Sequence, residues 1–158
     1  MLFRGTLCEP PFSIEVEQEP GLLRAFTEIA SDGQRVVAVV CELADIGKAY
    51  AEFSYSIAVV SLDDSHEPFQ TQDRTIAAGY IPADVRPNVI PLVADCLLAL
   101  VEAGKPQGVY RVSKDSHERA MARHHLLTEV LESAGFLVEK QGTDAHGRRF
   151  CTMRRNLD

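Results

Sequence analysis

Residues 108–136, GVYRVSKDSHERAMARHHLLTEVLESAGF, decide the fold of this chain. Their first six residues have the composition of a strand. Asp115, followed by Glu118, resembles a capping box and predicts that a helix begins there. Gly135 ends that helix, and Phe136 is placed to fold back onto it. The predicted helix carries an apolar stripe at helical spacing: Ala120, Leu127, Val130, Leu131 and Ala134.

On the C-terminal side of this stretch, two segments predict strands, at 136–141 and 148–154. The turn at 142–147 joins them, so we expect a hairpin.

On the N-terminal side, residues 89–103 are the most apolar segment of the chain and predict a helix buried on most sides. We expect Asn88 to be its N-cap. This start places Pro91 at the third helical position, where a missing N–H costs no intrahelical bond. Gly104 then ends the helix.

The first half of the chain is dominated by strand patterns. Strands are predicted at 12–18, 35–43, 51–59 and 75–81. A hairpin turn at 45–48 joins the second of these strands to the third. After Pro20 and Gly21, the apolar spacing of residues 22–30 predicts a short helix. Residues 62–74 form the longest polar segment without a pattern, and they are the best candidate for a lid over a site.

Composition limits the class of protein. The chain has 158 residues, of which 46% are hydrophobic and 25% charged, and this predicts a single domain over residues 1–158. Its formal net charge of −7 argues against a partner that is a nucleic acid or an acidic membrane. The four cysteines are scattered and predict no disulfide framework. We find no targeting segment and no uninterrupted apolar run long enough for a bilayer, so a cytoplasmic protein is expected.

Strands that follow helices require parallel neighbours, whereas hairpins require antiparallel ones. The element order therefore predicts an α/β fold with a mixed, mostly antiparallel sheet and helices on both faces.

The order of elements over residues 75–155 resembles that of the GNAT superfamily of N-acetyltransferases. The residues that carry the resemblance are Leu131-Glu132-Ser133-Ala134-Gly135-Phe136, then Gly147, Met153 and Arg154-Arg155. The resemblance implies a GNAT-like fold, a cofactor that is acetyl-coenzyme A or another acyl-coenzyme A, and transfer of the acyl group to an amine.

The resemblance also exposes departures from the family pattern. GNAT proteins hold the coenzyme A diphosphate on a loop of the type Gln/Arg-x-x-Gly-x-Gly/Ala, where this chain has Val85-Arg86-Pro87-Asn88-Val89-Ile90-Pro91. Both glycines are missing and two positions are prolines, so the usual set of backbone donors cannot form. Leu131 stands where the family often has a tyrosine acid. His124 stands in the place of a ligand-contacting asparagine.

From these residues we infer a candidate cofactor site at Arg86, Asn88, Val89 and His124. Arg86 offers a fixed charge to a phosphate where N–H groups are missing. The alternative interpretation, without a function, is that Arg86 is a solvated loop arginine. For His124 it is a histidine at the edge of the core. No metal site is predicted, because the histidine spacing does not suit one ion. The arginines of the last hairpin fall on opposite strand faces, which favours a solvated strand over an anion site.

Two functions remain open. The first is an acyl-coenzyme A-dependent N-acyltransferase with a non-standard phosphate loop, whose catalytic group the sequence does not identify. The second is a non-catalytic GNAT-like module that binds a small-molecule ligand or a protein partner. A homodimer through an exposed edge strand is compatible with either.

Overall fold

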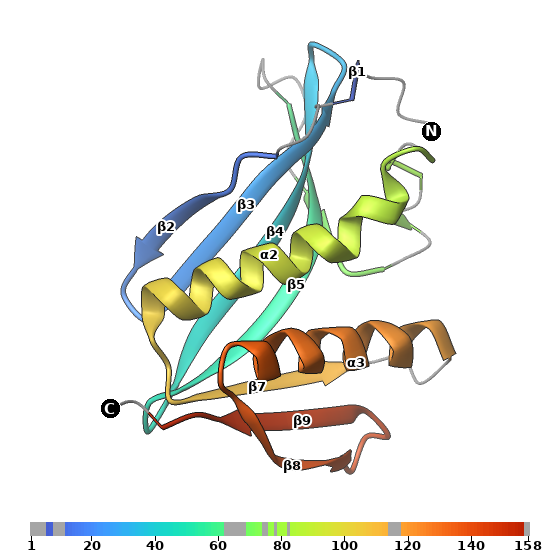
Figure 1. The fold of residues 1–158 in the computed structure, drawn as a ribbon. Coiled ribbons are helices and arrows are strands. Elements are labelled where there is room, and N and C mark those ends of the chain that lie inside the picture. Colours follow the sequence, from blue (N-terminus) through green and yellow to red (C-terminus); the bar gives the residue numbers. More distant parts are fainter. Residues whose placement is uncertain are drawn as a thin grey trace.

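The computed structural model describes residues 6–7, 12–61, 69–73, 76–77, 79–81, 83–113 and 118–156. Within these residues the strands join into one sheet in the order β1-β3-β4-β5-β7-β9-β8, with β2 paired to β3 and β6 to β5 (Figure 1). Every pair is antiparallel except β5 with β7. The predicted mixed, mostly antiparallel sheet is therefore confirmed.

Six strands come from the first half of the chain: β1 (Thr6–Leu7), β2 (Glu15–Glu19), β3 (Leu22–Ser31), β4 (Arg35–Gly47), β5 (Tyr50–Ser61) and β6 (Phe69–Thr71). The second half supplies the helices α2 (Arg86–Gly104) and α3 (Glu118–Ser133) and the strands β7 (Gly108–Ser113), β8 (Leu137–Thr143) and β9 (Arg149–Arg154). This half follows the order of elements that the GNAT resemblance implied.

The predicted helix over residues 22–30 is wrong, because this segment is strand β3. Pro20 and Gly21 form a two-residue turn, after which Leu22 pairs with Glu19 of β2. Gly21 has φ +74°, the left-handed conformation that the third position of a type II turn requires. The turn sends the chain back as a second strand, and Ala25, Thr27 and Ile29 are then buried with a period of two.

A further prediction fails between β5 and α2. Residues 76–77, expected in a strand, are helical. Asp73 caps this turn, because its Oδ1 accepts a hydrogen bond from the backbone N–H of Ile76 at 3.2 Å. The lid candidate lies mostly outside the described residues, but its Phe69–Thr71 portion is strand β6, paired with β5.

Helix α2 begins earlier than predicted. Val85 is its N-cap and provides no side-chain hydrogen bond, so Asn88 lies inside the first turn instead of capping it. Pro91 consequently lies in the helix interior.

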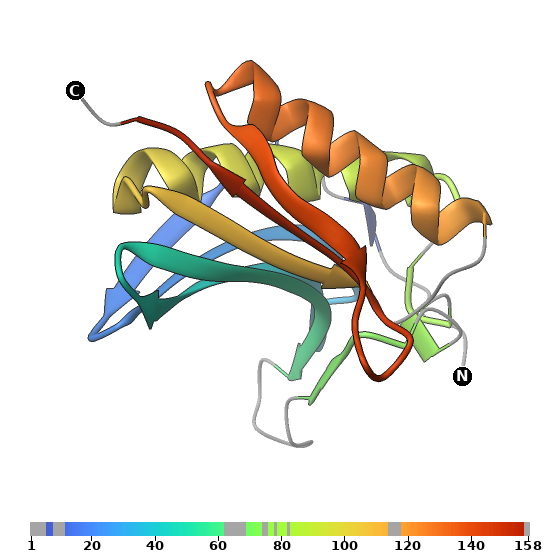
Figure 2. The ribbon, with the colours of Figure 1, turned by 90° about the horizontal axis from the view of Figure 1, so that it is seen from below.

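Both long helices cover the same side of the sheet in two views at right angles (Figures 1 and 2). The expectation of helices on both faces therefore receives no support from α2 and α3. By length and apolar composition alone, α2 would be able to cross a membrane. However, it packs on β3 and β4, and seven of its residues are buried, including Val93, Cys96, Leu97 and Leu100, which are fully buried. The apolar character of α2 is therefore that of a core helix.

Candidate functional site

The site lies where two strands separate. β5 and β7 pair over Tyr50–Glu52 and Gly108–Tyr110, the single parallel contact among the strands that the structure describes. Beyond these residues the strands diverge, and a cavity of about 730 Å³ opens between them. Residues of β5 from 52 to 57 line one wall, and Arg111, Val112 and Ser113 of β7 line the other. Because consecutive β5 residues face opposite sides of the sheet, the cavity is bordered by both faces of that strand.

On the helix side the walls are mainly apolar. Phe53 and Ile57 of β5 face Val89 and Ile90 of α2 across the opening, together with Leu127 of α3. Helix α3 borders the cavity with a set of residues at helical spacing: Ala120, Arg123, His124 and Leu127. This wall suits the flexible, uncharged arm of an extended ligand.

Five arginines line the cavity: Arg86, Arg111, Arg119, Arg123 and Arg148. These five side chains differ in their exposure to solvent. Arg86 and Arg119 are exposed, Arg123 and Arg148 are partly buried, and only 3% of Arg111 is exposed. The Nε of Arg148 donates to Asp144 at 2.8 Å, so the protein itself balances that charge. Together the guanidinium groups give the cavity a positive character.

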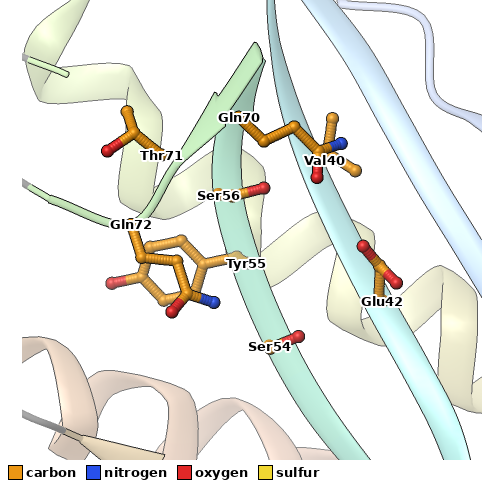
Figure 3. A pocket seen from close by; sticks show the side chains of 8 residues that line it. All are labelled: Val40, Glu42, Ser54, Tyr55, Ser56, Gln70, Thr71 and Gln72. Carbon is orange, nitrogen blue, oxygen red and sulfur yellow. The ribbon is translucent and has the colours of Figure 1, made fainter.

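The opposite side of β5 is acidic and polar. Glu42, Glu52, Ser54 and Ser56 border the cavity here. A second, smaller hollow of about 220 Å³ lies over β4, β5 and β6 (Figure 3). It shares Glu42, Ser54, Tyr55, Ser56, Thr71 and Gln72 with the large cavity, and Val40 and Gln70 complete its lining. Carboxylates and hydroxyls together suit a cationic, hydrogen-bonding group.

Three of the four candidate residues meet in the cavity. Arg86, Val89 and His124 line it, although the first two are 35 or more positions away from the third in the sequence. The Nε of Arg86 donates to the backbone oxygen of Ile81 at 3.1 Å, which fixes this side chain near the cavity. Asn88 is exposed and is not among the lining residues.

His124 is partly buried at the centre of the α3 wall. Its pKa is lowered to about 4, mainly by desolvation and to a smaller extent by nearby positive charge, of which that of Arg111 has the largest effect. The imidazole is therefore neutral at neutral pH, and it can accept or donate a hydrogen bond without adding charge.

The start of α2 has few free backbone donors. Pro87 has no N–H, and the N–H of Asn88 donates to the carbonyl of Val85 at 2.8 Å. A nest of donors for a diphosphate is therefore not assembled in the usual way. Positive charge near this end of the cavity comes instead from Arg86.

Sequence reasoning missed three arginines of the cavity, Arg111, Arg119 and Arg123. A signal existed for Arg123, which lies three residues after Ala120 and four before Leu127, at the border of the apolar stripe. Arg111 shares a strand face with the buried Val109, and nothing in the local pattern distinguishes it from a solvated arginine. Among the described residues, no group of three or more histidine, cysteine, aspartate or glutamate side chains is arranged to hold a metal ion.

No protein-family model and no curated protein matches this chain. Solved structures of spermidine N-acetyltransferases are similar to it. One is a chimera of SpeG from Vibrio cholerae and hSSAT, with 14% identity and a TM-score of 0.44 over 87% of this chain and 68% of that one. Another is a point mutant of Vibrio cholerae SpeG, with 13% identity and a TM-score of 0.43 over 87% of this chain and 66% of that one.

Proposed function

We propose that this protein is an acyl-coenzyme A-dependent N-acyltransferase and that its donor lies in the cavity between β5 and β7. The observation that carries the proposal is the division of this cavity by charge. Arginines and apolar side chains occupy the helix side, whereas Glu42 and Glu52 occupy the other. A donor with phosphates and a long uncharged arm fits the first side, and an amine acceptor fits the second.

The exposed arginines at the outer part of the cavity are the proposed phosphate ligands. Arg86 and Arg119 are exposed, and Arg123 is partly buried. A guanidinium binds a phosphate with two parallel hydrogen bonds, and it needs no free backbone N–H group. These side chains therefore replace the glycine-rich loop that the sequence lacks. The proposed donor site keeps Arg86, Val89 and His124 from the sequence analysis, without Asn88.

The proposed reaction joins the two sides. The uncharged amine nitrogen of the acceptor attacks the thioester carbonyl carbon, a C–N bond forms and the C–S bond breaks. The thiolate leaves with the electron pair and takes up a proton, while the amine loses one. Glu52 lies on the acidic side next to the parallel contact of β5 and β7, and we assign it the role of receiving the amine proton.

A second candidate is a binding module without catalysis, which one observation favours. Leu131, at the position of the family's tyrosine acid, is fully buried in the core. No movement of this side chain would bring a proton donor to that position. In this alternative the cavity holds an acyl-coenzyme A or another anionic ligand, and no acyl group is transferred.

Calorimetric titration with acetyl-coenzyme A at moderate salt tests donor binding. We expect a micromolar dissociation constant, and Arg86→Ala is expected to weaken binding about tenfold, or about 1.4 kcal/mol. Arg154→Ala, which removes the same charge at an exposed position outside the cavity, is the matched control.

Binding without transfer to any amine in an acceptor screen would favour the binding module. Transfer that Glu52→Gln slows at least tenfold would favour the enzyme. The absence of binding at millimolar ligand would contradict both candidates.

A further inference from the structure

Arg111 differs from every other charged residue in the described part of the chain. Only 3% of its surface is exposed, and no other described charged residue is buried. Strand β7 places it on the same face as Val109, immediately after the residues that pair with β5. It therefore lines the inner end of the cavity, where the two strands begin to separate.

Among the described residues Arg111 forms no ion pair with a carboxylate, and the Cys151 thiol opposite it on β9 also interacts with its guanidinium. Its Nη1 donates to the backbone oxygen of His124 at 3.1 Å, and its Nη2 donates to Oγ1 of Thr128 and lies 4.0 Å from Sδ of Met153. Its Nε is buried and has no hydrogen-bond partner among the described residues.

A comparison with Arg148 makes the difference clear. Both arginines line the cavity, but Arg148 is more exposed and holds the carboxylate of Asp144. A charge near the surface is stabilised by water even without a partner, whereas a buried guanidinium without a counterion is costly. The protein thus provides a counterion for Arg148, the arginine that needs one less. The buried arginine lines the cavity and has no carboxylate counterion among the described residues.

We propose that Arg111 binds a carboxylate carried by the ligand at the inner end of the cavity. This inference rests on the proposed function, and it narrows the substrate class. The donor phosphates meet the exposed arginines, so an anion at Arg111 belongs to the reacting end. It is the terminal carboxylate of a dicarboxylic acyl group or the carboxylate of an amino-acid acceptor.

The helix side of β5 favours the acyl group as the source. Arg111 contacts α3 through His124 and Thr128, on the side proposed for the donor. On the acceptor side Glu42 is paired with Arg24 at 3.9 Å, and Glu52 would repel a second carboxylate there.

The test compares two thioesters of equal chain length, succinyl-coenzyme A and butyryl-coenzyme A, by calorimetry. The wild-type protein is expected to bind the succinyl ester at least tenfold more tightly. In Arg111→Met this preference is expected to disappear. Arg154→Met is expected to keep the preference. Arg111→Lys, which keeps the charge, is expected to retain part of it.

A second arm assigns the source of the carboxylate. With coenzyme A bound, an amino acid is compared with its carboxamide. A tenfold preference for the amino acid that Arg111→Met removes would place the carboxylate on the acceptor. The inference would be overturned if the wild-type protein bound the succinyl and butyryl esters equally tightly and also bound the amino acid and its carboxamide equally tightly. This result does not depend on whether a variant folds.

The failure of the proposed function is a separate result. If no coenzyme A ester binds, free succinate and butyrate are compared by their effect on the melting temperature. If succinate but not butyrate raises the melting temperature, and Arg111→Met removes this effect, the carboxylate site is supported and the coenzyme A donor is rejected. No stabilisation by either would overturn both.

Discussion

Gly108 lies directly against the aromatic ring of Tyr50, where β5 and β7 form their parallel contact. A Cβ atom at Gly108 would lie 2.4 Å from Cε2 of Tyr50. The ring has little freedom to move away, because its hydroxyl donates to Oε2 of Glu139 at 2.6 Å. This hydrogen bond also raises the pKa of Tyr50. The bare backbone of Gly108 therefore allows β7 to approach β5 and fixes the point at which the cavity begins.

We predict that Gly108→Ala destabilises the protein by about 1 to 3 kcal/mol, the usual cost of overpacking. Gly142→Ala is the matched control, because its nearest neighbour would be Phe150 at 3.6 Å, an ordinary contact. Urea denaturation of both variants measures the difference. Equal stabilities would show that the Tyr50 ring yields at no cost.

Lowering the pH is predicted to weaken the fold through His124. Its pKa falls from 6.5 to about 4 on folding, so between these values the unfolded chain binds a proton that the folded chain does not. The stability contributed by the neutral imidazole is complete above pH 6.5 and is lost as the pH falls toward 4. His124 is only partly buried, and screening by solvent reduces the size of the effect.

Denaturation of His124→Gln between pH 7 and 4 tests this dependence, which should be flatter than in the wild-type protein. His125→Gln on the same helix controls for the change of residue type. An NMR titration with a His124 midpoint near 6.5 would contradict the prediction.

Pro91→Ala is predicted to stabilise α2. Pro91 is exposed in the helix interior and cannot donate to the carbonyl of Pro87. Restoring the hydrogen bond raises the free energy of unfolding by about 3 kcal/mol. The greater conformational entropy of the unfolded chain without proline lowers it by about 1 kcal/mol. We expect a net gain of about 1 to 2 kcal/mol in thermal or urea denaturation. An unchanged stability would mean that the first turn of α2 does not act as part of the helix.

Leu131→Ala is predicted to cost about 2 to 5 kcal/mol, because Leu131 is fully buried and its loss leaves a cavity. Leu137→Ala, at a position that is 73% exposed, should change the stability by no more than about 0.5 kcal/mol. Differential scanning calorimetry distinguishes the two. A small effect at Leu131 would indicate that the core of α3 collapses around the missing side chain.

Much of the fold was predictable where the local signals agree. β4, β5, β7 and α3 were predicted within a few residues, because long apolar or periodic segments bounded by glycine or a capping residue admit one secondary structure. Residues 22–30 failed because the apolar spacing of β3 also fits a helix. The tight turn at Pro20 and Gly21 places this segment beside β2, and pairing with β2 makes it a strand.

The candidate site was predicted only in part. Arg86 and His124 were found through the GNAT resemblance, which assigned them places in a known arrangement. The pattern around Arg111 resembles that of any arginine on a strand, so its burial and its missing counterion became visible only in the structure.

The sequence by itself determined the succession of strands and helices in the second half of the chain, because periodicity and capping act over a few neighbouring residues. Only the tertiary structure decided where β5 and β7 separate and which charges meet there. Those outcomes depend on contacts between residues far apart in the chain, such as Gly108 with Tyr50 and Arg111 with Thr128. Burial and the presence of a counterion are properties of such contacts, and no local pattern encodes them.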